Sequence, residues 1–254
     1  MTADDTDSNA GTEPTASRTA PAPRTLRDER ELGPMRRTIA KRLQESYREA
    51  VHVTVSRELD VEALLTATEA AENRFDVDVS VLDVLLGALS ETLDEHTEFN
   101  ATFEDGVHRR YVEHNVGVAV DIDAGLVTPV LGDVASMSVA EIARERRRLT
   151  ELVQADDHSM SDLRGGTITV TNLGVLNVDS FTPIINPPEV AILGVNRIRE
   201  RARSTGEGVE FRSTMNVDLT FDHRIVDGAD AGRFLESLAG HVENPGRLVA
   251  EAEM

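Results

Sequence analysis

The segment TMNVDLTFDHRIVDGADAGRFL (residues 214–235) changes its hydrophobic period from two to about 3.6 within one short turn. Its first half alternates apolar and polar side chains, which predicts a strand with one buried face. The apolar members are Met215, Val217, Leu219 and Phe221. Over residues 229–244 the apolar residues recur at helical spacing. We therefore expect a strand that turns directly into a helix.

Two side chains of this turn are candidates for chemistry. His223 ends the predicted strand, and Asp227 follows four residues later, just before Gly228 and the helix. A neutral imidazole, whose ordinary pKa is about 6.5, can accept a proton from a thiol or a hydroxyl. We expect Asp227 to cap the helix and thereby fix the turn that holds His223. A single histidine in a turn is nevertheless more often structural than catalytic, so both roles stay open.

A third candidate lies in the segment GTITVTNLG (residues 166–174), which also predicts a strand. Thr171 ends the polar side of this strand and is followed by the turn residues Asn172 and Gly174. A hydroxyl at such a place could donate to a developing oxyanion. The strand propensity of threonine explains Thr171 as well, because Thr167 and Thr169 share its side of the strand. Both explanations remain open.

Other periodic segments interleave irregularly along the chain, without an internal repeat. Helical spacing recurs over residues 32–50, 79–96 and 138–153, and strand-like alternation over residues 51–59 and 116–123. Two pairs, Ser80 with Asp83 and Ser138 with Glu141, fit the pattern of helix N-terminal caps. This arrangement predicts a mixed α/β sandwich in one domain, residues 29–254. Residues 1–28 are polar and rich in alanine, threonine and proline, so we expect a disordered tail.

The charge composition is unusual. The 254 residues carry a net charge of −20, which argues against binding to nucleic acid or to an anionic membrane. Of the 26 basic residues, only Lys41 is a lysine. This composition resembles that of proteins from the cytoplasm of salt-accumulating halophiles. At molar salt the Debye length falls to about 3 Å, so we expect folding or assembly to depend on high salt. An ordinary acidic protein is the alternative.

Several kinds of site are excluded or disfavoured by composition. The absence of cysteine excludes disulfides, thiolate metal sites and a cysteine nucleophile. The histidines show no metal-ligand spacing, and the glycines form no nucleotide-binding loop, so we expect no metal and no bound nucleotide. The N-terminus does not resemble a signal peptide, and no apolar run approaches the length of a membrane span. We therefore expect a cytoplasmic location.

The block D-H-R-x-x-D-G at residues 222–228 resembles the signature of the dihydrolipoamide acyltransferase component of 2-oxoacid dehydrogenase complexes. Five further segments resemble this family in the same order along the chain. They are PMRRTIAKRLQES (34–46), HVTVSRELDVEAL (52–64), VGVAVDIDAGLVTPVL (116–131), GGTITVTNLG (165–174) and FTPIINPPEVAILGVNRI (181–198). The resemblance implies the chloramphenicol-acetyltransferase-like fold, an α/β (α+β) two-layer sandwich with a mixed sheet and flanking helices. It also implies a homotrimer, with the active site in a channel between two subunits.

The resemblance assigns a role to each of the three candidates. His223 corresponds to the general base, which takes the proton from the thiol of coenzyme A, or from dihydrolipoamide in the reverse direction. The thiolate then attacks the acyl thioester. Thr171 corresponds to the hydroxyl that stabilises the tetrahedral oxyanion, and Asp227 to the group that orients the catalytic turn. This chemistry needs no metal and no bound cofactor, because coenzyme A and lipoamide are the substrates.

The sequence also departs from the family. Members usually carry lipoyl domains and a subunit-binding domain before the catalytic domain, and we expect neither here. Lys41 lies in a predicted helix, so the lipoyl group is expected on a separate protein, with the other dehydrogenase components as partners. The acidic end ENPGRLVAEAEM (residues 243–254) favours a trimer over a larger shell. Val175, Leu176 and Asn177 replace a stretch in which relatives often have glycine.

Two alternative functions stay open. One is a coenzyme A-dependent acyltransferase that uses a hydroxyl or an amine as acceptor. The other is a non-catalytic trimeric scaffold that organises partner enzymes. The sequence does not indicate which acyl group is transferred.

Overall fold

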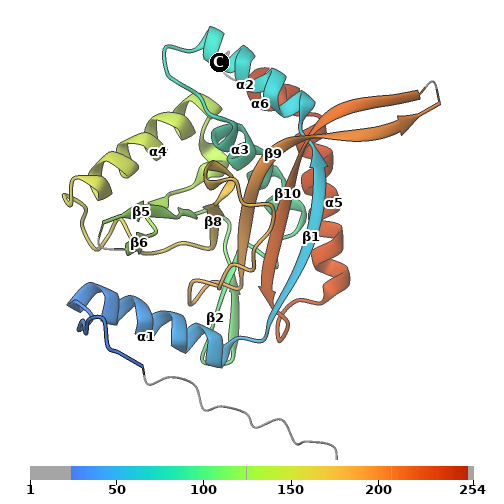
Figure 1. Ribbon diagram of the computed structural model, residues 1–254. Helices are drawn as coiled ribbons and strands as arrows, with labels where there is room; N and C mark the ends of the chain where they lie inside the picture. The colour runs from blue at the N-terminus through green and yellow to red at the C-terminus, as the bar shows by residue number, and fades with distance from the viewer. Residues whose placement is uncertain (1–23, 124, 207, 251–254) are drawn as a thin grey trace, which may run out of the picture. The chain divides into compact units, whose positions relative to one another are not determined.

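The computed structural model describes residues 24–123, 125–206 and 208–250 (Figure 1). The chain divides into two compact units, residues 1–32 and 33–254. Every helix and strand of the described residues lies in the second unit. Of the tail predicted over residues 1–28, only residues 24–28 are described, and they form neither helix nor strand. The four C-terminal residues, 251–254, also lie outside the described part.

A six-stranded sheet with the strand order β1-β10-β9-β8-β4-β7 organises the second unit. Its strands are β1 (His52–Asp60), β4 (Val116–Val118), β7 (Val130–Leu131), β8 (Ile168–Asn172), β9 (Ala191–Thr205) and β10 (Gly208–Asp222). Strand β8 runs parallel to β4 and β9, whereas the other pairs are antiparallel. The expected mixed sheet is therefore confirmed. Two small sheets join β2 (Ala101–Glu104) to β3 (Val107–Arg110), and β5 (Val120–Ile122) to β6 (Gly125–Val127).

The predicted strand over residues 116–123 is wrong in one respect, because the chain changes sheets within it. Strand β4 pairs with β7 and β8 in the main sheet, whereas β5 pairs with β6. The apolar alternation continues through the change at Ala119, so periodicity alone does not reveal it. The predicted strand at residue 214 also begins earlier, because β10 starts at Gly208 and forms a long hairpin with β9.

The predicted helices are present with nearly the expected bounds. The α-helices are α1 (Pro34–Glu49), α2 (Glu62–Arg74), α3 (Val81–Glu95), α4 (Val139–Gln154), α5 (Gly228–Glu243) and α6 (Gly246–Ala250), with 3-10 turns η1 (Val134–Ser136) and η2 (Gly174–Leu176). Both predicted capping boxes form, at Ser80 with Asp83 and at Ser138 with Glu141. At α4 the Ser138 N–H donates to Glu141 Oε2 at 2.8 Å. This bond gives a hydrogen-bond partner to the backbone N–H of the N-cap residue. None of the described helices is long and apolar enough to cross a membrane.

The helical layer is centred on α3. Ten of its 15 residues are buried, from more than one side of the helix, so it lies inside the layer and not on its surface. Arg146 of α4 donates to the buried Asp83 carboxylate of α3, with Nη2 and Oδ2 3.0 Å apart. Met215, Val217, Leu219 and Phe221 of β10 pack in the same hydrophobic core as this helix. Helices and one face of the sheet thus form the two layers that the sequence predicts.

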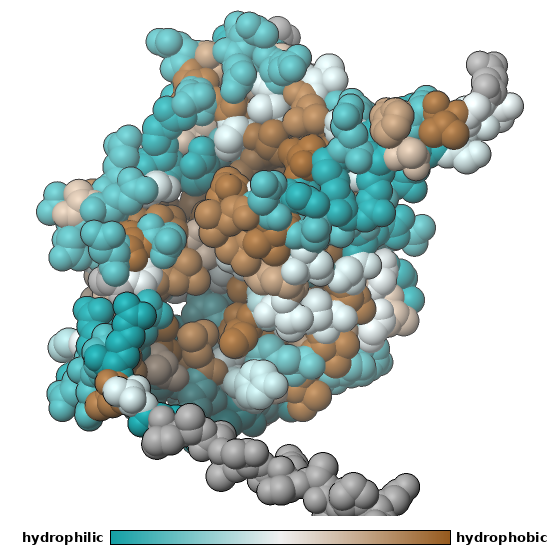
Figure 2. All heavy atoms as spheres, in the orientation of Figure 1, coloured by the Kyte–Doolittle hydropathy of each residue, from teal (hydrophilic) through white to brown (hydrophobic). Residues whose placement is uncertain are grey.

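The other face of the sheet is polar but also covered. Asp218 and Thr220 lie on this face of β10 and are fully buried. The segment 173–190, which connects β8 to β9, lies over it, and the Ile185 N–H donates to His52 Nε2 at 3.2 Å. Helix α1 joins this cover, because Ser46 Oγ donates to the carbonyl of Ile185 at 2.6 Å. Figure 2 shows that hydrophilic side chains dominate the outer surface of α1.

Candidate active site

The turn that carries His223 is tied to the start of β1. The His223 N–H donates to the carbonyl of Val51 at 2.9 Å. The neighbouring Asp222 carboxylate accepts the Val51 N–H at 3.2 Å and the Arg224 N–H at 3.1 Å. The Arg224 Nε also donates to Asp222 Oδ2 at 3.0 Å. These bonds hold the backbone on both sides of His223.

The residues on either side of His223 are therefore structural. Burial by itself would raise the pKa of Asp222, but hydrogen bonds from Arg224 and Val51 outweigh it and hold that pKa below its usual range. Asp222 stays ionised and keeps its guanidinium partner. The Arg224 guanidinium in turn lies over the ring of Phe103, 4.9 Å from its centroid. Sequence reasoning identified this block but not the contacts by which it holds the turn.

His223 and Asp227 lie together at this turn. His223 Nδ1 is 3.7 Å from Asp227 Oδ1, which is longer than a hydrogen bond but close enough for attraction once the imidazole is protonated. Asp227 is the N-cap of α5, and its N–H donates to Asp230 Oδ2 at 3.3 Å. The His223 side chain is 40 % exposed. Asp227 faces Nδ1, and the other ring nitrogen, Nε2, has no hydrogen bond to any described residue.

Thr171 lies in β8 with its side chain almost buried, on the polar face of the sheet. The Thr167 hydroxyl donates to Asn100 Oδ1 at 2.5 Å, and the Thr169 hydroxyl to Glu189 Oε2 at 2.6 Å. Within the described part of the chain, the Thr171 hydroxyl has no such partner. Two of the three threonines therefore serve the internal hydrogen-bond network, whereas Thr171 keeps a donor available.

A single chain does not bring Thr171 and His223 together. Thr171 pairs with Gly194 across β8 and β9, and Gly194 pairs with Asp218 across β9 and β10. His223 follows Asp218 by five residues along the chain. Two strand spacings and five residues of extended chain correspond to about 19 Å between the backbones of Thr171 and His223. A site that uses both side chains needs a second copy of the chain.

The stretch after Thr171 keeps a conformation that glycine favours. Asn177 has φ 65° and ψ 25°, the left-handed region, which asparagine tolerates better than most residues. Asparagine at position 177 is therefore compatible with this turn. Val175 and Leu176 are 82 % and 70 % exposed, so two large apolar side chains project next to the end of β8.

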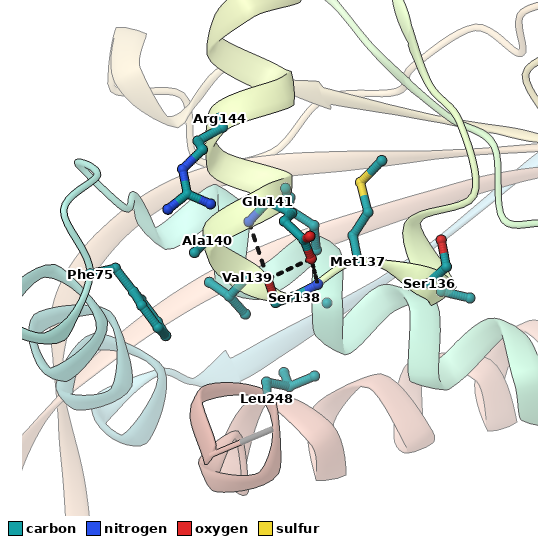
Figure 3. Close-up of a pocket in the computed structure, with 12 residues that line it drawn as sticks. Phe75, Ser136, Met137, Ser138, Val139, Ala140, Glu141, Arg144 and Leu248 are labelled. Carbon is teal, nitrogen blue, oxygen red and sulfur yellow. Dashed lines mark hydrogen bonds between the residues drawn. The ribbon is translucent and has the colours of Figure 1, made fainter. Parts of the chain in front are cut away.

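The remaining histidines and a separate cavity do not add to this site. His52 accepts the Ile185 N–H, and burial lowers the pKa of His114, whose Nδ1 is 2.7 Å from Ser90 Oγ. Among the described residues, no group of three or more histidine, aspartate or glutamate side chains could hold a metal ion. Figure 3 shows a pocket lined by Phe75, which follows α2, and by residues of α3, η1, the start of α4 and α6. Its volume is about 490 Å³. None of the three candidate residues lines it.

Comparison with known proteins decides the family. A model of the catalytic domain of the 2-oxoacid dehydrogenase acyltransferases matches residues 26–250. The chain belongs to this family. It is 36% identical over 233 residues to the dihydrolipoyllysine-residue succinyltransferase component of the 2-oxoglutarate dehydrogenase complex of Bartonella vinsonii subsp. berkhoffii, covering 89% of this chain and 56% of that protein. It is 37% identical over 222 residues to the lipoamide acyltransferase component of the branched-chain alpha-keto acid dehydrogenase complex of Pseudomonas aeruginosa, covering 85% and 52%.

The 2-oxoacid dehydrogenase acyltransferase chain thus spans about half the length of the curated relatives it matches. Its fold is similar to that of the dihydrolipoamide acetyltransferase of Azotobacter vinelandii, with a TM-score of 0.84 and 28% identity over 91% of this chain and 100% of that one. Chloramphenicol acetyltransferase is also similar, with a TM-score of 0.54 and 15% identity over 81% of this chain and 93% of that one, which bears on the fold alone. The predicted chloramphenicol-acetyltransferase-like sandwich is confirmed.

Proposed function

We propose that this chain transfers an acyl group between coenzyme A and a lipoyl thioester, as the catalytic domain of a 2-oxoacid dehydrogenase complex. The observation that carries the proposal is the His223 turn, which hydrogen bonds and an ion pair hold at the end of β10. The two curated relatives described above are acyltransferase components of such complexes. Residues 29–254 are the catalytic domain in this proposal.

The mechanism follows from the geometry of the turn. His223 Nε2 accepts the proton of the attacking thiol, and the resulting thiolate adds to the thioester carbonyl. The imidazolium then forms next to the Asp227 carboxylate, which stabilises it. When the tetrahedral intermediate collapses, His223 returns the proton to the departing thiolate. Thr171 donates to the oxyanion of that intermediate, and one such donor typically lowers the barrier by roughly 3 kcal/mol.

A relative with a studied mechanism supports the choice of residues. In the Azotobacter vinelandii enzyme, a serine, a histidine and an asparagine have been examined for their role in catalysis. Successive members of that set are 52 and 4 residues apart, and the same separations relate Thr171, His223 and Asp227 here. Threonine would supply the hydroxyl in place of serine. Aspartate would supply a charge in place of the amide.

The proposed site lies between subunits of a homotrimer. The support is the separation of about 19 Å between Thr171 and His223 within one chain, which a neighbouring copy would close. One similar structure is the cubic core of a pyruvate dehydrogenase multienzyme complex. We propose an isolated trimer and not such a shell. Light scattering at high salt tests this, since a mass eight or twenty times that of a trimer would contradict it.

The lipoyl group is expected to be attached outside this sequence. Lys41 is the only lysine, and it lies in α1 between Ala40 and Arg42, not in an exposed hairpin. A lipoyl group attached outside this sequence would therefore present the acyl group, and the other dehydrogenase components would be further partners. The net charge of −20 and the near absence of lysine also support a protein adapted to high salt.

A transfer assay tests the proposal. The purified chain in about 3 M KCl receives free dihydrolipoamide and acetyl-, succinyl-, propionyl- or branched-chain acyl-coenzyme A. We expect transfer with at least one donor, and its loss in His223→Ala. Transfer only to a hydroxyl or an amine acceptor would instead indicate the alternative acyltransferase. An intact trimer without turnover on any donor would indicate a scaffold.

A further inference from the structure

Asp218 is a buried carboxylate without a cationic partner. It lies within β10 on the polar face of the sheet, and its side chain is fully buried. No described residue forms an ion pair with it. An ionised carboxylate in such a place is strongly unfavourable unless hydrogen bonds replace its hydration. A buried carboxylate that engages so many hydrogen-bond donors indicates a role beyond filling the sheet.

The hydrogen bonds to Asp218 come from three separate parts of the chain. Ser56 of β1 donates through its hydroxyl, and Asn196 of β9 through Nδ2 at 2.7 Å. The other donors belong to the segment after η2. The Ser180 hydroxyl is 3.0 Å and 3.1 Å from the two carboxylate oxygens, and the Phe181 N–H donates at 3.0 Å. One carboxylate therefore fixes this segment to two strands of the sheet.

The same contacts reach the surroundings of Thr171. Asp218, Gly194 and Thr171 lie in line across β10, β9 and β8. A Cβ atom at Gly194 would lie 2.9 Å from the ring of Phe181, so the ring rests directly on this glycine. Gly194 is next to Thr171 across the strand pair, and the ring therefore borders the place where the Thr171 side chain lies. The Thr171 hydroxyl has no hydrogen bond to a described residue that would fix its direction.

We propose that Asp218 is a positioning residue for the acyl-transfer site: through the Phe181 N–H and Ser180 it holds the wall that orients the Thr171 hydroxyl. This inference rests on the proposed function. Asp218 does not touch a substrate. Its effect on catalysis passes through Thr171, and this dependence gives it a signature that a merely structural residue lacks.

A double-mutant cycle between Asp218 and Thr171 tests the inference. In the intact trimer at high salt, Asp218→Asn is expected to lower kcat by about tenfold, because the misdirected hydroxyl loses part of its transition-state bond. The KM values for both thiol substrates should change less than about twofold. In the Thr171→Ala background, Asp218→Asn should lower kcat by less than about twofold. An equal loss in both backgrounds, or an unchanged kcat in the first, overturns the inference.

The matched control is Thr220→Val, on the same face of the same strand. Thr220 is fully buried, and its hydroxyl is 2.7 Å from that of Thr54, but no hydrogen bond links its side chain to the segment after η2. This variant should melt at a lower temperature with an unchanged kcat. If Asp218→Asn does not fold, Ser180→Ala takes its place in the double-mutant cycle. Its kcat is expected to fall by about threefold, and an equal loss in the Thr171→Ala background again overturns the inference. If the unmodified trimer transfers no acyl group, the proposed function itself is refuted. If it is active but the effects of the Asp218 and Thr171 substitutions are additive, only the positioning role is refuted.

Discussion

Replacing Glu189 by glutamine is expected to remove a loss of stability that develops as the pH rises. Glu189 is almost fully buried and accepts hydrogen bonds from the Thr169 hydroxyl at 2.6 Å and from Asn186 Nδ2 at 3.0 Å. No described residue forms an ion pair with it. Burial raises the pKa of Glu189 from its ordinary value of 4.5 to about 8, although the two hydrogen bonds and the charge of Arg42 act in the opposite direction.

The sign and size of the effect follow from this pKa. Between pH 4.5 and about 8 the folded chain keeps the proton of Glu189, whereas the unfolded chain has lost it. Stability therefore falls as the pH rises through this window, and becomes level above it. One pKa unit corresponds to 1.36 kcal/mol, so the free energy of unfolding should fall by roughly 3 kcal/mol between about pH 5 and pH 7.5 through this group alone. Glutamine stays neutral and does not contribute this loss.

Denaturant unfolding at constant high salt, measured for the unmodified chain and for Glu189→Gln, checks this prediction. From about pH 5 to pH 7.5, the unfolding free energy of Glu189→Gln should rise by roughly 3 kcal/mol relative to that of the unmodified chain. Glu69→Gln is the matched control, because Glu69 is exposed on α2 and should produce no such shift. A difference that is constant with pH, or that moves toward the unmodified chain, would refute the reasoning.

Three further predictions concern the site and the charge. Thr171→Val should lower kcat by roughly 100-fold in steady-state transfer assays. The kcat of Thr171→Ser should stay within about tenfold of that of the unmodified chain. Equal losses in both variants would show that the Thr171 hydroxyl does not contribute to catalysis. Asp222→Asn should destabilise the chain by about 1–3 kcal/mol in thermal or denaturant unfolding, because it weakens the pairing with Arg224 and Val51. An unchanged stability would show that the Asp222 carboxylate does not hold the turn. The melting temperature should rise strongly between 0.1 M and 3 M KCl, and a melting temperature that does not change would exclude adaptation to high salt.

The elements with a clear period were predictable from the sequence. The second half of β10, helix α5 and the capped starts of α3 and α4 all follow local rules of spacing and capping. Strand β9 was not predicted as a strand, because its first residues, 191–195, are all buried and show no alternation. Helix α2 was missed because it buries mostly small residues, which give a weak helical pattern. These failures come from burial on two faces and from small side chains, both of which are tertiary properties.

The site was predictable only in part. The local block predicted that Asp227 caps α5, but not that its carboxylate lies 3.7 Å from His223 Nδ1. The local block did not reveal the role of Val51. Val51 is 171 residues from Asp222 in the chain and holds the turn through bonds from its backbone. The distance between Thr171 and His223 depends on the register of two strand pairs, which the sequence does not encode locally. The resemblance to a family supplied the roles, and the register explains why one chain alone does not complete the site.

Mixed assemblies of two impaired variants test the central claim most directly. His223→Ala and Thr171→Ala are each purified, mixed in equal amounts, unfolded, and reassembled at high salt before acyl transfer is measured. If each site takes His223 from one copy and Thr171 from its neighbour, random trimers regain about a quarter of the activity of the unmodified protein. Activity that stays at the average of the two separate variants would contradict a shared site, and with it the proposed arrangement of base and oxyanion donor.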